Sequence, residues 1–249
     1  MSYSIALAGK GGTGKTTMAG LLIKYLIEKG KTPVLAVDAD ANANLNEVLG
    51  VEVKATLGDA REEMKKGVSQ GMTKDVFMEM KLQQAVIERS AFDLIVMGRP
   101  EGAGCYCAAN SLLTVCLEKL IDNYNFVITD NEAGMEHISR LISNNIDVLL
   151  VVSDPTRRGI QAAARIVELT DELGLNIERK AVIVNQVKQG QEGIIKKLVK
   201  EYQLDLIGMV PEDSDVREFD LNGRPTIELP KENTGVRSAY EIFERIIRE

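Results

Sequence analysis

The chain is poor in the features that build disulfide frameworks, nucleic-acid interfaces and membrane spans. It has three cysteines in 249 residues and a single histidine. So few cysteines, behind a first segment patterned as a core strand and not as a signal peptide, predict a reducing cytoplasmic environment. The formal net charge of -7 argues against a nucleic-acid partner, because clustered lysine and arginine bind phosphate backbones. No apolar run approaches the roughly 20 residues of a membrane span, so no membrane partner is expected.

The apolar pattern predicts one α/β domain. Short apolar runs alternate with segments of helical periodicity, and several runs are continuously apolar, as in parallel strands covered on both faces. This alternation predicts a doubly wound, mostly parallel sheet with helices on both faces and ligands at the carboxyl ends of the strands. We expect residues 1–249 to form a single domain, with residues 47–92 as a peripheral helical insertion. The expected strands are 4–8, 33–37, 94–98, 126–129, 148–152, 181–185 and 206–210, and the clearest helices are 18–28, 112–122, 161–173 and 193–202.

A glycine-rich motif between the first expected strand and the first expected helix is the most specific feature. Residues 9–17, GKGGTGKTT, have the spacing Gly-x4-Gly-Lys-Thr. Glycines let successive backbone N–H groups curl around phosphate oxygens, and the following helix N-terminus adds positive partial charge. Lys15 can neutralise the β- and γ-phosphates, and Thr16 can ligate the accompanying magnesium ion. The motif predicts a nucleoside triphosphate site made of Gly11, Gly12, Thr13, Gly14, Lys15, Thr16 and Thr17.

Lys10 is a second lysine in this motif, and phosphate binding within one chain does not need it because Lys15 already supplies the charge. The segment KGGTGKT resembles the deviant P-loop of the MinD/ParA/nitrogenase-iron-protein class. That resemblance implies an ATPase whose early lysine reaches across a face-to-face homodimer to the nucleotide of the partner, as an arginine finger does in other NTPases. Lys10 would then be catalytic in trans. The alternative is a solvated surface lysine.

Two aspartates, Asp38 and Asp40, follow the second expected strand. A carboxylate that emerges beside a P-loop is placed to hold magnesium or to orient an attacking water. The stretch resembles the first switch of the same class, whose second aspartate positions the hydrolytic water, and this role passes to Asp40. Asp38 is expected to support the magnesium shell, with a polar strand terminus as the alternative.

The fourth expected strand ends at Asp130, and Gly134 follows four residues later. An aspartate after an apolar strand is typical of a Walker B carboxylate, so we expect Asp130 to hold magnesium through water. The Gly134 amide could contact the γ-phosphate, so that hydrolysis relaxes the loop. The segment resembles the second switch of the class, Asp-x-Pro/Ala-x-Gly, although Asn131 and Glu132 depart from its usual filling.

Weaker signals at the ends of the sixth and seventh expected strands indicate which nucleotide base is bound. These strands end at Asn185 and before Pro211-Glu212-Asp213. In the class that the chain resembles, an asparagine at the first place bonds the adenine edge and a Pro-Glu-Asp turn packs beside the base. Gln186 follows Asn185, so no guanine-type Asn-Lys-x-Asp motif occurs there and ATP is favoured. The alternative for Asn185 is a loop-capping asparagine.

Cys105 and Cys107 distinguish the chain from a generic ATPase. They lie in a glycine-rich loop after the third expected strand. Two thiolates are too few for a closed structural site, but a two-fold dimer brings four, enough for zinc, nickel or an iron–sulfur cluster. Inert cysteines are the alternative.

The loop containing Cys105-Tyr106-Cys107 resembles that of the CooC-type ATPases, which assist nickel insertion into carbon monoxide dehydrogenase. The resemblance implies an ATP-dependent metallochaperone whose homodimer binds Ni²⁺, or Zn²⁺ in isolation, and delivers it to a client apo-enzyme. The nitrogenase iron protein has a similar loop but draws a second ligand cysteine per chain from its second switch. Residues 130–137 contain no cysteine, which argues against an electron-transfer cluster.

Two other functions stay open, an iron–sulfur or electron-carrier ATPase and a positioning ATPase of the MinD/ParA type. Some MinD-like proteins have a C-terminal amphipathic membrane anchor, and residues 236–247 are amphipathic. Their polar face mixes acids and bases, so a docked final helix is expected instead. Cys116, on an apolar helical stripe, and His137 are expected to be structural.

Overall fold

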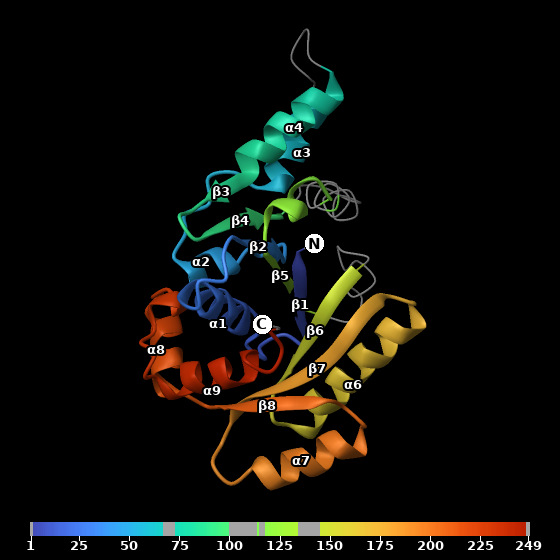
Figure 1. Ribbon diagram of the computed structural model, residues 1–249, viewed down its shortest axis with the longest axis vertical. Helices are drawn as coiled ribbons and strands as arrows, with labels where there is room; N and C mark the ends of the chain where they lie inside the picture. The colour runs from blue at the N-terminus through green and yellow to red at the C-terminus, as the bar shows by residue number, and fades with distance from the viewer. Residues whose placement is uncertain (1, 67–72, 100–113, 115–117, 134–144, 248–249) are drawn as a thin grey trace.

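The computed structural model describes residues 2–66, 73–99, 114, 118–133 and 145–247. The strands are β1 (Tyr3–Gly9), β2 (Val34–Ala39), β3 (Val86–Glu88), β4 (Phe92–Val96), β5 (Phe126–Asn131), β6 (Asn145–Ser153), β7 (Asn176–Val187) and β8 (Leu206–Pro211). They form one sheet in the order β3-β4-β2-β5-β1-β6-β7-β8 (Figure 1). β3 pairs antiparallel with β4, and the other neighbouring strands are parallel.

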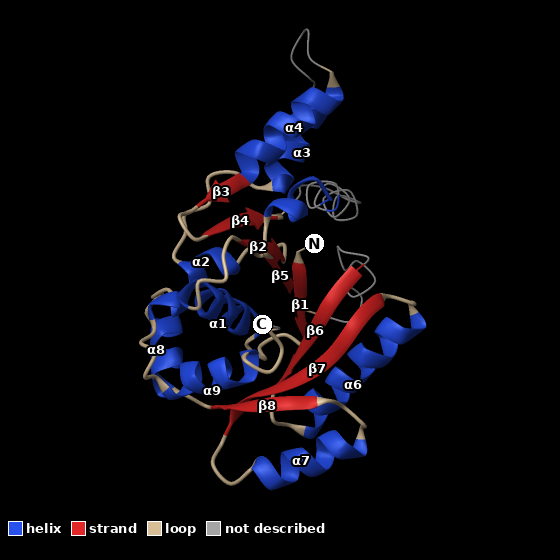
Figure 2. Ribbon diagram, viewed as in Figure 1, coloured by secondary structure: helices blue, strands red, loops and turns tan. Residues whose placement is uncertain are grey.

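Helices cover both faces of this sheet (Figure 2). They are α1 (Lys15–Glu28), α2 (Leu45–Leu49), α3 (Leu57–Lys66), α4 (Lys74–Ala85), α6 (Arg157–Glu172), α7 (Glu192–Glu201), α8 (Ser214–Leu221) and α9 (Thr234–Phe243), with 3₁₀ turns η1 (Ile121–Asn123) and η3 (Thr226–Glu228). Residues of α1, α2, α8 and α9 pack in one hydrophobic cluster, and residues of α6 and α7 pack in another on the opposite face. The fold is therefore the expected doubly wound α/β sheet.

Central strand β1 shows why its sequence is apolar from Ile5 to Ala8. Ile5 and Leu7 belong to the cluster under α1 and α9, whereas Ala6 and Ala8 belong to the cluster under α6. Successive side chains of a strand point to opposite faces, and here both faces are buried. All seven expected strands are present with shifted bounds. The additional strand β3 escaped prediction because it is a short, half-exposed edge strand with no apolar run.

α3 and α4 lie side by side beyond the β3–β4 edge of the sheet (Figure 1). Leu57, Leu82 and Ala85 close a third hydrophobic cluster against β2 and β4, and Lys81 pairs with Glu63 between the two helices. Both helices and β3 fall within residues 47–92. The division of the chain into one domain and an insertion stays a prediction, and the expected helix 112–122 lies mostly outside the described residues.

The C-terminal amphipathic run is a docked helix, as expected. Val236, Ala239 and Phe243 of α9 are fully buried against the cluster that contains α1. The Tyr25 and Tyr240 rings meet edge to face, with their centroids 5.1 Å apart. None of the helices in the described part of the chain has the length and apolar character that a bilayer crossing requires.

Candidate nucleotide-binding site

The P-loop connects the end of β1 to the start of α1, and two of its glycines are sterically required. A Cβ atom on Gly9 would lie 2.3 Å from the carbonyl oxygen of Val152. Gly14 has a φ of 86°, and a Cβ there would lie 2.4 Å from Nδ2 of Asn185. Gly14 stands at the N-cap of α1, and no side chain of the described residues caps this helix, so its first N–H groups are left for an anion.

A cavity of about 480 Å³ lies over this helix N-terminus. Asp40 lines it beside six of the predicted P-loop residues, Gly11, Gly12, Gly14, Lys15, Thr16 and Thr17. The seventh, Thr13, is buried, and its hydroxyl donates to the Lys10 carbonyl at 2.9 Å. Lys10 is exposed and does not line the cavity.

Two buried carboxylates stand side by side under the cavity. Asp38 on β2 and Asp130 on β5 are register partners, with 0% and 2% of their surface exposed. The pKa of Asp38 is raised from 3.8 to about 7, first by burial and then by the charge of Asp130, while hydrogen bonds from backbone donors oppose the rise. Burial also raises the pKa of Asp130, to about 6, against the effects of a Thr16 hydrogen bond and the Lys15 charge. Burial lowers the pKa of Lys15, although Asp130 and Asp40 raise it.

The donor set around Asp130 suits a hydrated divalent cation. Its Oδ1 is buried without a hydrogen-bond partner among the described residues, and the Thr16 side chain bonds the same carboxylate. Carboxylate and hydroxyl oxygens are the ligands that magnesium takes beside phosphates. An unpaired oxygen in so buried a place costs free energy unless a ligand satisfies it. Thr16 and Asp130 are therefore the residues that could hold magnesium.

Asp38 has a different set of partners. Its Oδ1 accepts from the Asp40 amide at 3.0 Å, and its Oδ2 accepts from the Leu45 amide at 2.9 Å. The second bond anchors the start of α2, and the first fixes the backbone of Asp40. Asp40 is half-buried and accepts from the Asn42 amide at 2.8 Å. Asp38 thus positions the loop that carries Asp40 into the cavity.

A second cavity of about 330 Å³ adjoins the first one, and Gly14, Thr17, Gln186 and Asp220 line both. It brings together the residues predicted for the base, Asn185, Pro211, Glu212 and Asp213. Asn185 is buried, and its Nδ2 donates to the Thr13 carbonyl at 2.9 Å. The structure therefore gives this asparagine a bond to the phosphate loop.

Asp213 caps α8. Its carboxylate accepts from the Asp215 and Val216 amides at 3.0 and 3.2 Å, from Asn233 Nδ2 at 2.9 Å and from the Gly235 amide at 3.1 Å. Partial burial opposes ionisation, but these hydrogen bonds outweigh it, so the pKa of Asp213 lies below its ordinary value. Its side chain is largely occupied within the protein.

Sequence reasoning missed three residues of the site. Gln186 has a φ of 59°, and its Nε2 donates to the Gly12 carbonyl at 3.3 Å. Asp220 and Arg224 form part of the far wall of the phosphate cavity. Asp220 and Arg224 are four residues apart, and this helix-like spacing is a signal that could have indicated a common wall, although α8 ends at Leu221. Asn131, which departs from the family pattern, donates to the Leu7 carbonyl at 2.9 Å.

The predicted soft-metal site lies outside the described residues. Cys105, Cys107 and Gly134 all fall in segments without description, as do Cys116 and His137. Within the described ranges, no group of three His, Cys, Asp or Glu side chains gathers in a way that could hold a metal ion. The thiolate site stays a prediction.

Comparisons with known proteins agree with this geometry. The family model of the CobQ/CobB/MinD/ParA nucleotide binding domain matches residues 4–227. An uncharacterized ATP-binding protein of Methanocaldococcus jannaschii is 44% identical, over 98% of each chain. The carbon monoxide dehydrogenase accessory protein CooC of Rhodospirillum rubrum is 31% identical, over 90% of this chain and 89% of its own.

Among solved structures, the septum site-determining protein MinD of Pyrococcus horikoshii, complexed with Mg-ADP, is similar with a TM-score of 0.75. The match covers 100% of this chain and 97% of MinD at 24% sequence identity. At this identity the likeness bears on the fold alone.

Proposed function

This chain belongs to the CobQ/CobB/MinD/ParA family of P-loop ATPases, and on that premise we propose that it is an ATP-dependent metallochaperone for a nickel enzyme. The observation that carries the proposal is the combination of a complete P-loop site with the Cys-x-Cys pair at 105 and 107. The 31% identity to CooC over nearly the whole chain supports the same assignment.

In this proposal, ATP binds in the two adjoining cavities. The P-loop amides and Lys15 hold the phosphates in the larger cavity, where burial limits competition from water. The adenine lies in the smaller cavity, against Pro211 and Glu212. The ribose then lies near Asp220, which lines both cavities.

In this proposal, the carboxylates of Asp130, Asp40 and Asp38 support ATP hydrolysis. Thr16 and, through water, Asp130 would hold magnesium, whose charge stabilises the transferring phosphoryl group. Asp40 orients the attacking water from the rim of the cavity. Asp38 supports this step indirectly, because it fixes the Asp40 backbone.

The exposed Lys10 acts in a homodimer. A lysine outside its own phosphate cavity is free to reach the nucleotide of a second chain. ATP would close the dimer, and Cys105 and Cys107 of both chains would supply four thiolates for the cargo metal. Reopening would then release nickel to a client apo-enzyme of the carbon monoxide dehydrogenase kind.

Metal stoichiometry tests the proposal. Wild-type protein titrated with Ni²⁺ in the presence of ATP should bind about half an equivalent per chain, because four thiolates complete one site. Cys105→Ala and Cys107→Ala should each lose most of this binding and retain ATP hydrolysis, since neither cysteine belongs to the P-loop motif at residues 9–17. Cys116→Ala is the matched control and should bind metal like the wild type.

Three results would contradict the proposal: a full equivalent bound to a monomer, unchanged binding in the Cys105/Cys107 double variant, or a visible iron–sulfur chromophore in the pure protein. The last result would favour the electron-carrier alternative. Nickel bound only by the Cys116→Ala and wild-type proteins would support the proposal.

A further inference from the structure

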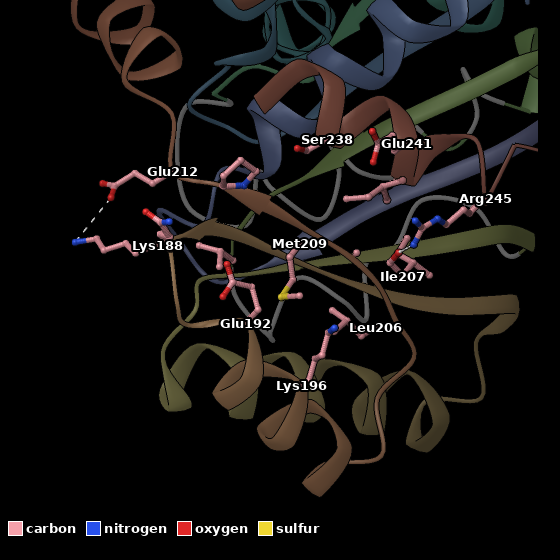
Figure 3. A pocket seen from close by; sticks show the side chains of 15 residues that line it. Lys188, Glu192, Lys196, Leu206, Ile207, Met209, Glu212, Ser238, Glu241 and Arg245 are labelled. Atoms are coloured by element: carbon pink, nitrogen blue, oxygen red, sulfur yellow. Dashed lines mark hydrogen bonds and ion pairs between the residues drawn. The ribbon is translucent and has the colours of Figure 1, made fainter. Parts of the chain in front are cut away.

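A groove with a volume of about 750 Å³ runs along the open edge of β8 and contains none of the P-loop residues in its lining (Figure 3). Its floor includes the half-buried apolar residues Leu206 and Met209. Its walls are α7 on one face of the sheet and α9 on the other, and each belongs to a different hydrophobic cluster. The groove therefore lies at the exposed edge of the sheet, between the helices that cover its two faces.

Each wall presents an acid followed four residues later by a base. On α7 these are Glu192 and Lys196, and on α9 and its continuation they are Glu241 and Arg245 (Figure 3). Neither pair closes as an ion pair within the described chain, although Lys24 and Glu28, at the same spacing, lie 3.1 Å apart. The carboxylates of both walls therefore stay available for ion pairs with a partner molecule.

The strand edge itself is partly covered. Nη1 of Arg245 donates to the Ile207 carbonyl at 2.8 Å. A guanidinium has five N–H donors, so this bond leaves donors for a carboxylate from outside. Lys188 and Glu212, 3.8 Å apart, close one end of the groove, which brings its lining to three acids and three bases. A nucleic acid or phosphate ligand would need a basic groove, and this one is balanced.

We infer that the β8 groove is a contact between two copies of this chain, related by a two-fold axis perpendicular to the sheet. Such an axis sets the two β8 edges antiparallel, and each wall helix then faces its own copy in reverse direction. Glu192 comes to lie against Lys196 of the second copy, and Glu241 against Arg245. The same rotation buries the apolar floor of both grooves. Because the acid and base of each wall pair with the base and acid of the same wall in a second copy, the charges of the groove favour a second copy of this chain as its partner.

This contact is distinct from the ATP-dependent dimer proposed above. That dimer uses the P-loop side of the sheet, whereas the groove uses the β8 edge. Pro211 and Glu212 line both the groove and the base cavity, so the two sites share one turn. The β8 contact requires no nucleotide, and this property separates it from the other dimer.

Sedimentation equilibrium of the full chain, without nucleotide and at low salt, tests the inference. Wild type should form dimers, and Glu192→Lys and Lys196→Glu should each raise the dimer dissociation constant by about tenfold, because one substitution turns two attractions into two repulsions. The swapped variant Glu192→Lys/Lys196→Glu keeps a self-complementary wall and should return to within about threefold of wild type. Added salt should weaken the dimer.

Lys197→Glu is the matched control, because Lys197 is exposed on the same helix and does not line the groove. It should leave the dissociation constant unchanged. All of these side chains are exposed, so folding is not at risk. A wild type that stays monomeric at about 100 µM, well above the dissociation constant of specific dimers, overturns the inference. A swapped variant no better than the single substitutions, or an equal loss in Lys197→Glu, also overturns it.

Discussion

The two adjoining cavities of the nucleotide-binding site differ in how their polar side chains are used: the larger one is the phosphate end and the smaller one is the base end of the proposed ATP site. At the phosphate end, Lys15 and Asp130 are buried, the pKa of each is displaced, and Asp130 keeps an oxygen without a partner among the described residues. At the base end, Asp213 caps α8 and Asn185 bonds the P-loop backbone. The phosphate end thus keeps an unpaired carboxylate oxygen among the described residues, whereas Asp213 and Asn185 at the base end are hydrogen-bonded within the protein.

This difference assigns affinity and specificity to different places. Buried charges with unmet hydrogen-bonding capacity gain most when a charged ligand arrives, because the folded protein already carries the desolvation cost. Groups satisfied within the protein gain little from a ligand. We therefore expect binding free energy to come mainly from the phosphates and magnesium, and only a small part from the adenine edge.

The largest expected effect is on the phosphate end. Lys15→Ala should weaken ATP binding by about a hundredfold or more, since charge-assisted contacts to phosphate contribute about 1.5–3 kcal/mol each. Lys10→Ala removes an equal charge from an exposed position and should keep ATP affinity within about threefold. Titration calorimetry with ATP measures both. Equal losses in the two variants would contradict the assignment of Lys15.

A smaller effect concerns the unpaired carboxylate. The folded pKa of Asp130, about 6, lies above its ordinary value of 3.8, so the folded state binds more protons than the unfolded state. The contribution of Asp130 to the stability of the ligand-free protein should therefore fall as the pH rises from about 4 to about 6. Asp130→Asn removes this cost and should raise the free energy of unfolding by about 1–2 kcal/mol at pH 8, with no gain near pH 4.

Thermal or urea unfolding at the two pH values measures this effect, and magnesium with ADP provides the second readout. The nucleotide should stabilise the wild type in a magnesium-dependent way, and Asp130→Asn should lose that dependence. Asp40→Asn is the control: Asp40 lines the cavity above Asp130 but is half-exposed, so the change should affect stability less. Destabilisation by Asp130→Asn at both pH values would refute the account.

The same contrast explains how far the sequence could predict this molecule. The P-loop is contiguous, and its flanking strand and helix have clear periodicity, so Gly14, Lys15 and Thr16 could be placed in a cavity before any coordinates. The parallel sheet followed from apolar runs at strands such as β1, which is buried on both faces. The sequence therefore predicted those features whose residues are contiguous in the chain.

The remainder depends on tertiary contacts. Nothing near Asp38 indicates that its carboxylate anchors the Leu45 amide, and nothing near Asn185 indicates that its amide bonds the Thr13 carbonyl, 172 residues away in the chain. The groove at β8 exists because that strand ends the sheet, and strand order is not written in any local motif. Contacts between distant segments decide these roles.

The smallest effect sharpens the base end. Asn185→Ala removes the buried donor to the Thr13 carbonyl and should loosen the P-loop. We expect ATP and GTP affinities to fall together by about fivefold, because the bond supports the phosphate loop common to both nucleotides. Competition binding with ATP and GTP measures the ratio. A loss confined to ATP would instead mean that Asn185 recognises the adenine base.

Asp213→Ala is the companion variant. It should lower the free energy of unfolding by about 1–2 kcal/mol through the lost cap of α8, and it should change the ATP dissociation constant by less than about threefold. If it weakens ATP binding more than Asn185→Ala does, the base end contributes affinity after all, and the contrast between the two ends fails.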